Sequence, residues 1–376
     1  MRIAIISRVF SKSGGGAESY SVALVQQLVP RHEIHVFAQE SNHPVDGVTY
    51  HRIFCLSRKP RWINQILFAI ATWMLTRRGF DVVHSHENTW HGQIQTIHVQ
   101  PIRYNLFFAK NGIRLFLKWV KVVLSPRLLT YVLLEGARFK ASPVRHVVAT
   151  SETLCAECVQ AYPAATSAIS VITPGTNLPE NSLEKKAARQ ILDLPQESSI
   201  VLFVANDYAK KGLNTLLKAL VSLPADVDLV VVGNPKAAPK YRQQAERSGL
   251  GKRVYFLGSL DDLSLVYTAA DCLAHPTLAD SFAMVVLEAM AHGLPAIVSS
   301  TEYCGISRHL QHGVDALLLS DPKDEKRLAE LIDLLFNNQE LAGNIRSNGL
   351  KFAEQHSWGR AALQYEKLYF QAVSKC

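Results

Sequence analysis

Short runs of apolar, often β-branched residues alternate with helical patterns along almost the whole 376-residue chain. Continuous apolar strands separated by helices are typical of parallel sheets covered on both faces. The first set of candidate strands is RIAIIS, EIHVFAQ, VTYHRIF, DVVHSH, IQTIHV, HVVAT and ISVIT. After the turn-rich stretch TPGTNLPENS, a second set follows: SIVLFVA, DLVVVGN, VYFLGS, DCLAHP, LPAIVSS and DALLL. This restart predicts two doubly wound α/β domains in series, joined by a hinge.

The length of the chain supports this division, because a single hydrophobic core rarely serves so many residues. We expect an N-terminal domain over residues 1–177 and a C-terminal domain over 178–356. Residues 357–376 have the spacing of a final helix, which could return to the N-terminal domain, although periodicity alone does not place it. Ligands of such folds bind beyond the carboxyl ends of the strands, so the expected site is a cleft between the domains.

Composition narrows the class of protein. Hydrophobic residues make up 48% of the chain and charged residues 19%, as in a globular protein, and the net charge of +8 favours anionic partners. The N-terminus shows no signal-peptide pattern, so we expect a cytoplasmic protein. The apolar stretch 62–76 is too short to span a bilayer, and we expect it to form a buried or surface-lying helix. Cys155 and Cys158 lack a second pair at zinc spacing and are interpreted as two incidental thiols on a helix.

Two loops could bind an anion. In the first, Gly14, Gly15 and Gly16 stand between a strand and a helix, where the backbone can approach a phosphate. The loop is not a dinucleotide fingerprint, and a flexible turn explains it equally well. In the second, Lys210 and Lys211 follow a strand and precede a helix, where two ammonium groups could neutralise a diphosphate. A solvated basic turn is the alternative.

Two acids stand eight positions apart in ADSFAMVVLEAMAHGLP. Asp280 occupies the place of a helix N-cap, which needs no substrate to explain it. Glu288 is surrounded in sequence by apolar residues, and a carboxylate there must find hydrogen-bond donors. A ribose would supply two. The acids of DVD at 226–228 directly precede a strand, as is ordinary, and no other cluster suggests a metal, so we expect no metal ion.

Together these stretches resemble the retaining glycosyltransferases of family 4, which have the GT-B architecture of two facing Rossmann-like domains. The most specific element is the family's pair of acids with seven residues between them, here in HPTLADSFAMVVLEAMAHGLP. Within the family, the segments 204–220, 230–250 and 254–276 look most like the glucosyltransferases that add the first glucose to the lipopolysaccharide inner core. The resemblance implies transfer of a hexose, with glucose expected, from a nucleoside-diphosphate sugar such as UDP-glucose. The implied acceptor is a saccharide or glycolipid.

The resemblance also implies roles for the residues of the C-terminal domain. Glu288 matches the acid that holds the donor ribose, and Asp280 matches the acid that contacts the transferred sugar. The amides of Phe282, Ala283 and Met284 would join Asp280 in contacting the sugar and diphosphate. The lysine that binds the diphosphate corresponds to Lys211, with Lys210 as its basic neighbour.

In the N-terminal domain, Gly15 and Gly16 match the loop that closes on the donor, and His98 matches a histidine beside the donor sugar and acceptor. Two positions depart from the family pattern: the first acid is Asp280 rather than a glutamate, and Ala283 replaces the usual glycine. Without a metal, Lys210, Lys211 and the helix N-terminus would have to stabilise the leaving diphosphate. Attack on the face from which the diphosphate departs is the implied retaining route.

Several alternatives remain open at this stage. A sugar-nucleotide epimerase shares the architecture but would need no acceptor, and the acceptor could instead belong to exopolysaccharide or another glycolipid. A basic nucleic-acid binder is a non-enzymatic alternative, but the sequence shows no helix-turn-helix, zinc-finger or RNP-like motif, so we expect no nucleic-acid partner.

A membrane-facing helix is the last expectation. Between residues 109 and 140, Arg114, Lys118 and Lys121 fall on one face of a predicted helix, with Trp119 and other apolar residues around them. This composition is typical of a helix lying in a membrane interface. A core helix with a solvated basic stripe explains the pattern at least as well. The first interpretation predicts reversible contact with anionic lipid at the inner face of the cytoplasmic membrane.

Overall fold

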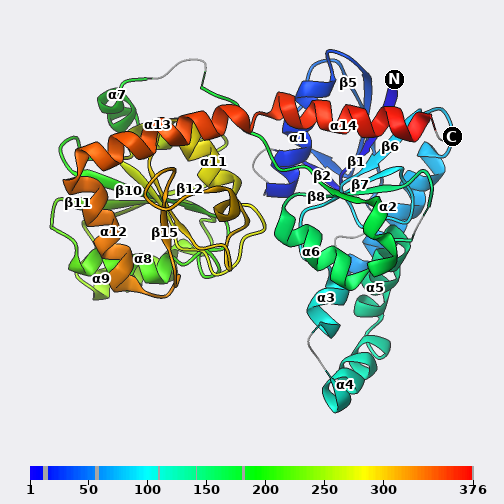
Figure 1. Ribbon diagram of the computed structural model, residues 1–376, viewed down its shortest axis with the longest axis horizontal. Coiled ribbons are helices and arrows are strands. Elements are labelled where there is room, and N and C mark those ends of the chain that lie inside the picture. The colour runs from blue at the N-terminus through cyan, green and yellow to red at the C-terminus, as the bar shows by residue number, and fades with distance from the viewer. Residues whose placement is uncertain (12–15, 56–58, 109–110, 141, 180–182, 375–376) are drawn as a thin grey trace. The chain divides into compact units, whose positions relative to one another are not determined.

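The computed structural model describes residues 1–11, 16–55, 59–108, 111–140, 142–179 and 183–374. The chain divides into two compact units (Figure 1). One unit combines Met1–Pro174 with Trp358–Cys376, and the other is Gly175–Ser357. Each unit is an α/β fold around a parallel sheet, as the alternating sequence pattern predicts.

The first unit contains a seven-stranded parallel sheet in the order β5-β3-β1-β6-β7-β8-β9. Its strands are β1 (Arg2–Ile6), β3 (Glu33–Ala38), β5 (Val48–Arg52), β6 (Val82–Ser85), β7 (Ile94–Ile97), β8 (His146–Ala149) and β9 (Ile169–Val171). A two-residue pairing of β2 (Val9–Phe10) with β4 (Glu40–Ser41) stands apart from this sheet. The strand order reverses between β1 and β6, and this switch point is where doubly wound sheets bind ligands.

The second unit contains a six-stranded parallel sheet in the order β12-β11-β10-β13-β14-β15. Its strands are β10 (Ser199–Ala205), β11 (Val227–Gly233), β12 (Val254–Gly258), β13 (Cys272–His275), β14 (Ala296–Ser299) and β15 (Leu317–Leu319). Here the order reverses between β10 and β13. The switch point therefore brings together the loops that follow these two strands, which carry the lysine pair and Asp280 respectively.

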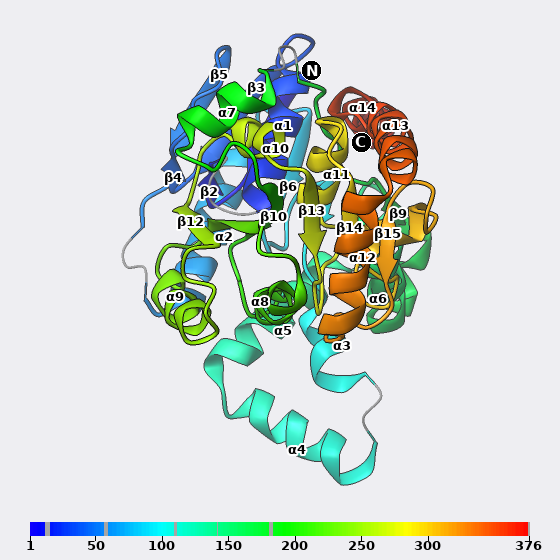
Figure 2. The same cartoon turned by 90° about the vertical axis from the view of Figure 1, so that its left-hand side faces the viewer.

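Helices cover both sheets (Figures 1 and 2). In the first unit they are α1 (Gly16–Leu28), α2 (Arg61–Thr76), α3 (Ile102–Phe107), α4 (Gly112–Val123), α5 (Pro126–Arg138), α6 (Glu152–Ala161) and α14 (Trp358–Val373), with η1 (Pro163–Ala168). In the second unit they are α7 (Lys185–Ile191), α8 (Leu213–Ser222), α9 (Ala238–Arg247), α10 (Ser264–Ala269), α11 (Met284–Ala291), α12 (Glu325–Asn337) and α13 (Gln339–Gln355), with η2 (Gly305–His309). None of the described helices combines the length and apolar character needed to cross a bilayer.

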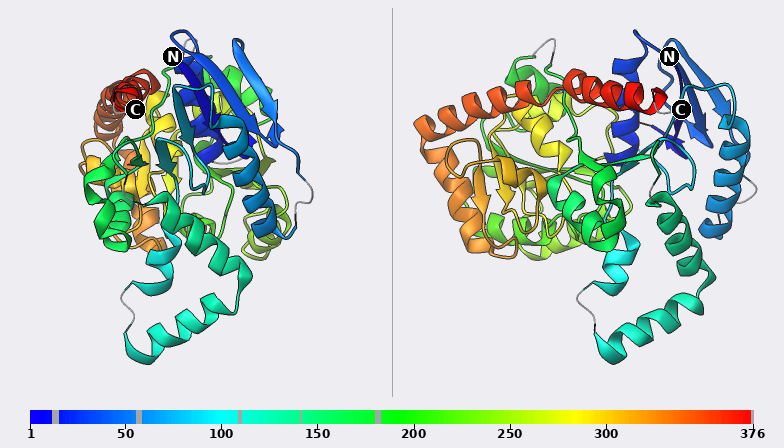
Figure 3. Two further views of the ribbon diagram at one scale, coloured as in Figure 1. Left: turned by 90° about the vertical axis from the view of Figure 1, so that its right-hand side faces the viewer. Right: turned by 45° about the vertical axis from the view of Figure 1, so that its right-hand side comes forward.

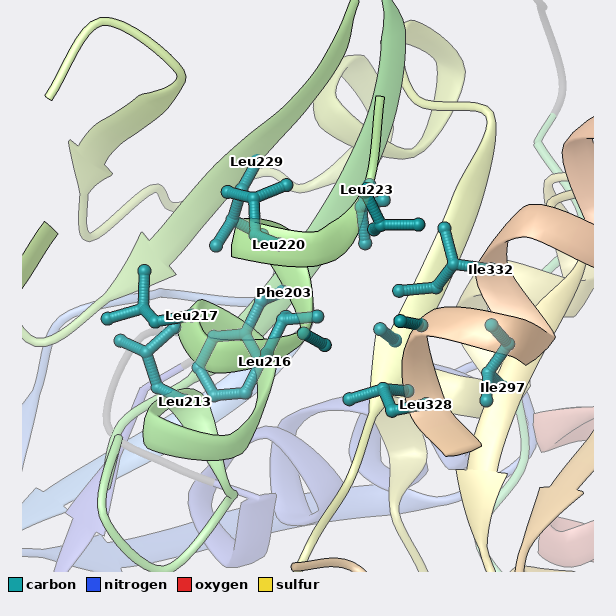
Figure 4. Packing of buried hydrophobic residues seen from close by; sticks show 14 of the residues in the cluster. Phe203, Leu213, Leu216, Leu217, Leu220, Leu223, Leu229, Ile297, Leu328 and Ile332 are labelled. Atoms are coloured by element: carbon teal, nitrogen blue, oxygen red, sulfur yellow. The ribbon is translucent and has the colours of Figure 1, made fainter. Parts of the chain in front are cut away.

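The helix that follows the lysine pair is fixed by the core of the second unit (Figure 4). Leu213, Leu216 and Leu220 of α8 are fully buried and belong to one cluster with Phe203 of β10. Leu328 and other residues of α12 pack into the same cluster. Because α8 cannot shift without disturbing this core, the turn directly before it is held in place.

The last helix packs against the first unit through buried hydrogen bonds. The hydroxyl of Tyr365 lies 2.9 Å from that of Tyr20 on α1 and 2.8 Å from Oγ1 of Thr96 on β7. One turn later, the Tyr369 hydroxyl lies 2.7 Å from Nδ1 of His84 on β6. These polar contacts attach α14 to the sheet of the first unit, next to α1 (Figure 3).

Candidate functional site

In the second unit, the turn that carries Lys210 and Lys211 contacts the loop after β13, which carries Asp280. Lys211 Nζ contacts Asp280 Oδ2 and donates to the carbonyl of Ala279 at 3.2 Å. The two predicted site residues are therefore direct partners, although 69 positions separate them. Lys210 is exposed, and its carbonyl accepts the amide of Leu278 at 2.9 Å, which ties the two loops together a second time.

Gly212 makes this docking possible. Its φ is +83°, and a Cβ there would lie 1.9 Å from the carbonyl oxygen of Pro276. Only glycine allows the backbone both this conformation and this approach. The sequence Lys-Lys-Gly thus places the second ammonium group beside Asp280 because the third residue has no side chain.

Asp280 does not cap the helix as its place in the sequence suggests. Helix α11 begins at Met284, and its N-cap is Ala283, so the N-cap prediction for Asp280 is wrong. Instead, Asp280 Oδ1 accepts the amides of Phe282 at 3.3 Å and Ala283 at 3.0 Å. The reason is local geometry: Ala283 has φ +70°, which turns the chain between these amides and the helix.

His275 completes this cluster and was not singled out from the sequence as a functional residue. It is the last residue of β13, is 1% exposed, and lies with Nε2 3.1 Å from Asp280 Oδ2. Burial lowers the pKa of His275, so the ring is neutral at pH 7 and Nε2 is the donor. Its position at a strand end, five residues before Asp280, was the available signal.

Four donors surround the Asp280 carboxylate, and they decide its charge. Burial alone would raise the pKa of Asp280, but the hydrogen bond from His275 and the charge of Lys211 hold it well below its usual range. Asp280 is therefore ionised at neutral pH. Because a carboxylate has about four acceptor positions, any further hydroxyl must replace one of the present donors.

Glu288 lies on α11, eight residues after Asp280. Its Oε2 accepts a hydrogen bond of 2.8 Å from the hydroxyl of Tyr267 on α10. Among the described residues, no partner is found for Oε1. Burial raises the pKa of Glu288, and the bond from Tyr267 opposes that rise. One protein donor, which the sequence did not identify, thus satisfies one oxygen of the Glu288 carboxylate. The other oxygen remains for a ligand.

The predicted residues of the first unit lie elsewhere. Gly16 is the first residue of α1, whereas Gly15 lies outside the described residues. His98 directly follows β7, with Nε2 3.0 Å from Nδ1 of His86 and its ring edge-on to Tyr20. Burial, and to a lesser degree the charge of Arg138, lowers the pKa of His98 to about 3, so the imidazole is neutral at pH 7.

The structure contains the helix expected around the two cysteines and the helix expected to carry the basic residues of segment 109–140. Cys155 and Cys158 lie on α6, and neither forms a disulfide. Arg114, Lys118 and Lys121 lie on α4, where Trp119 stacks on Phe107 at a centroid distance of 4.5 Å. In the described part of the chain, no group of three or more His, Cys, Asp or Glu side chains is placed to hold a metal ion.

Two parallel-sheet units define the class of this protein, and the second unit has a lysine–aspartate pair at its switch point and an acid on α11. Residues 14–179 match the model of Glycosyltransferase Family 4, and residues 184–352 match that of Glycosyl transferases group 1. The chain therefore has the GT-B fold, and its first and second parts each match a glycosyltransferase family model.

Named relatives refine this result only in part. The chain is 29% identical over 228 residues to the D-inositol 3-phosphate glycosyltransferase of Corynebacterium glutamicum, covering 57% of this chain and 54% of that protein. It is 25% identical over 240 residues to the lipopolysaccharide glucosyltransferase WaaG of Escherichia coli, covering 61% of this chain and 63% of that protein. These alignments thus span less than two thirds of the relatives' own lengths.

Solved structures agree on the fold. A crystal structure of WaaG, a glycosyltransferase involved in lipopolysaccharide biosynthesis, matches with a TM-score of 0.83 and 18% identity, covering 98% of this chain and 99% of that one. HepE of Anabaena in complex with UDP-glucose matches with a TM-score of 0.75 and 20% identity, covering 98% of both chains. At these identities the likeness establishes a shared fold alone.

Proposed function

We propose that this protein transfers a hexose, with glucose the expected sugar, from a nucleoside-diphosphate sugar such as UDP-glucose to a saccharide or glycolipid acceptor. The observation that carries the proposal is the contact between Lys211 and Asp280 at the switch point of the second sheet. It fixes a cation directly beside the amides that lead into α11, which is an arrangement suited to a diphosphate.

The hydrogen-bond inventory supports this assignment. An ammonium group has three donors, and Lys211 uses two of them on Ala279 and Asp280, so one remains for a phosphate oxygen. Exposed Lys210 adds a second positive charge. The amide of Met284 lies in the first turn of α11 and therefore has no acceptor within the helix. These groups would stabilise the negative charge that develops on the leaving diphosphate.

The two acids have different proposed roles. The vacant oxygen of Glu288 would accept a ribose hydroxyl while Tyr267 holds the other oxygen in place. Asp280 would position Lys211 and contact the transferred sugar, with a sugar hydroxyl replacing the long bond from the Phe282 amide. His98, as a neutral imidazole, would lie beside the donor sugar and acceptor, and the loop containing Gly15 and Gly16 would close on the donor. We propose that no metal ion takes part.

The decisive experiment compares Glu288→Gln with the wild type in calorimetric titrations with UDP-glucose. Loss of a charged acceptor should weaken donor binding by ~1.5–3 kcal/mol, which is roughly a 10- to 150-fold change. Tyr267→Phe is the matched control: it removes only the second hydrogen bond of Glu288 and should have a smaller effect. Wild-type affinity in folded Glu288→Gln would refute the ribose assignment.

Two acceptor classes have specific support. The relative named a lipopolysaccharide glucosyltransferase favours a lipopolysaccharide-core acceptor, and the relative named a D-inositol 3-phosphate glycosyltransferase favours an inositol phosphate. We place the core acceptor first because the segments 204–220, 230–250 and 254–276 resemble the glucosyltransferases of the lipopolysaccharide core. Transfer assays with both acceptors and radiolabelled UDP-glucose distinguish them. Turnover of the inositol phosphate alone would reject the core acceptor.

We also propose that α4 contacts anionic lipid at the inner face of the cytoplasmic membrane. Figures 2 and 3 show this helix extending from the sheet of its own unit. Apolar side chains at 113, 116, 117, 120 and 124 form one exposed stripe, in which Phe116 is 64% exposed. Arg114, Lys118 and Lys121 flank that stripe, as in an interfacial helix.

Vesicle sedimentation tests the lipid contact. Each cation near an anionic surface contributes ~1 kcal/mol, so changing Arg114, Lys118 and Lys121 together to Gln should release most of the bound protein, as should added salt. A control variant changes Lys236, Arg247 and Lys252 to Gln; these exposed cations lie in the second unit. If the two triple variants bind anionic vesicles equally, α4 is not the contact.

A further inference from the structure

A cavity of about 440 Å³ lies in the first unit, and none of the proposed donor-site residues is among the residues that line it. Its walls come from the end of α2 and from the segments that lead into β6, β7 and β8. The main side chains are Trp73, Arg77, Phe80, Trp90, His91 and Arg145. The cavity therefore lies at the amino ends of these strands, whereas His98 follows the carboxyl end of β7. Its volume is within the range of small-molecule sites.

Aromatic rings form a large part of the wall. Trp73 and Phe80 come from α2 and the turn after it, and Trp90 comes from the segment before β7. Trp73 is 41% exposed, so one indole is accessible from solvent. Aromatic faces of this kind pack well against the C–H face of a sugar ring, which is apolar on one side and hydroxylated at its edge.

Two polar groups in the wall lack partners. Both ring nitrogens of His91 are buried, and neither has a hydrogen-bond partner in the described part of the chain. Burial, with a smaller effect from Arg145, lowers the pKa of His91 to about 4, so the ring offers one donor and one acceptor at pH 7. Buried polar groups without partners are rare in native proteins, and a ligand hydroxyl would satisfy one of these nitrogens.

The charge of the wall is positive. Arg77 and Arg145 contribute two guanidinium groups, and none of the described residues that line the cavity is acidic. Arg145 donates through Nη1 to the carbonyl of Ala137 and through Nη2 to that of Trp90, both at 2.6 Å, while its buried Nε has no partner among the described residues. Arg77 is exposed, with its guanidinium over the ring of Trp73. Two uncompensated guanidinium groups favour an anionic ligand.

We propose that this cavity is a binding site for a phosphorylated saccharide, separate from the donor site. The sugar ring packs on Trp73 and Trp90, a hydroxyl bonds to His91, and the phosphate lies between the two arginines. This inference goes beyond the proposed transfer reaction and does not depend on it, because binding is measured without turnover.

Calorimetry with glucose 6-phosphate, glucose and inorganic phosphate tests the site at pH 7. We expect glucose 6-phosphate to bind at least fivefold more tightly than either fragment. Trp73→Ala, Arg77→Gln and His91→Phe should each weaken that binding at least fivefold. Three matched controls should leave it unchanged: Trp119→Ala removes another half-exposed indole, Arg78→Gln removes the neighbouring exposed cation, and Lys211→Ala disables the proposed donor site.

Four outcomes overturn the proposal. If inorganic phosphate binds as tightly as glucose 6-phosphate, the saccharide is not recognised. If glucose binds as tightly, the phosphate is not recognised. Loss of binding in Lys211→Ala assigns the ligand to the donor site, and no binding at millimolar concentration rejects the site. A second experiment distinguishes a lipid-linked saccharide from a free one. It uses neutral vesicles that carry lipid A, a phosphorylated disaccharide on acyl chains. If the saccharide is lipid-linked, these vesicles should bind Arg77→Gln less than Arg78→Gln. Equal binding there assigns the site to free sugar phosphates.

Discussion

The turn before α8 offers a sharp test of how the site is assembled. Replacing Gly212 by Ala puts a methyl group 1.9 Å from the carbonyl oxygen of Pro276 and demands φ +83° from an alanine. Gly249→Ala is the matched control, because that residue has φ +73° and nothing within 4 Å of an added Cβ. Both substitutions have the left-handed backbone penalty, but only the first has the clash.

The expected magnitudes differ accordingly. The left-handed conformation costs a residue other than glycine about 1–2 kcal/mol, which is the whole effect expected for Gly249→Ala. Overpacking adds about 1–3 kcal/mol, so Gly212→Ala should lose about 2–5 kcal/mol. Moving the methyl group from 1.9 Å to the 3.0 Å that real contacts require shifts the turn by 3.0 − 1.9 = 1.1 Å. Such a shift would separate Lys211 from Asp280.

Urea unfolding of both variants and calorimetric titration with UDP-glucose measure these effects. Gly249→Ala should bind the donor as the wild type does, while Gly212→Ala should bind it at least tenfold more weakly. The reasoning is refuted if the two variants are equally stable and Gly212→Ala retains wild-type donor affinity. Partial denaturation is excluded as a cause by recording near-UV circular dichroism under the titration conditions.

Three further predictions follow from the same structure. Ala283→Gly should change the free energy of unfolding by less than about 0.5 kcal/mol, because relief at φ +70° offsets the entropy of glycine, whereas Ala289→Gly within α11 should cost at least ~1 kcal/mol; equal losses in urea unfolding would contradict this. Burial lowers the pKa of His84 from 6.5 to about 3, so the unfolded chain binds its proton first, and stability is lost as pH falls below 6.5. At pH 5, which is 6.5 − 5 = 1.5 pH units below the unfolded pKa, His84 lowers the free energy of unfolding by about 2 kcal/mol. The melting temperature of His84→Gln should therefore fall less between pH 7.5 and pH 5 than that of the wild type. Lys211→Ala should lower kcat more than Lys210→Ala, because Lys211 alone of the pair contacts Asp280; the reverse order in initial-rate assays would exchange their roles.

Much of the fold could be predicted from the sequence. All thirteen candidate strands are present, and two parallel sheets result, because continuous apolar runs can be buried only in sheets covered on both faces. The prediction of helix over 62–76 is confirmed by α2. Lys211, Asp280 and Glu288 could be singled out because they are polar residues at strand ends or within an apolar helix, where local sequence alone marks them as unusual.

The tertiary structure alone decided which partners these residues contact. The sequence does not show that Lys211 reaches Asp280, that His275 donates to the same oxygen, or that Tyr267 satisfies half of Glu288, since strand order brings together segments far apart in the chain. Asp280 was misassigned as an N-cap because periodicity does not resolve the left-handed turn at Ala283. The docking of α14 likewise depends on buried hydroxyls finding acceptors on another segment, a condition that periodicity along one helix cannot express.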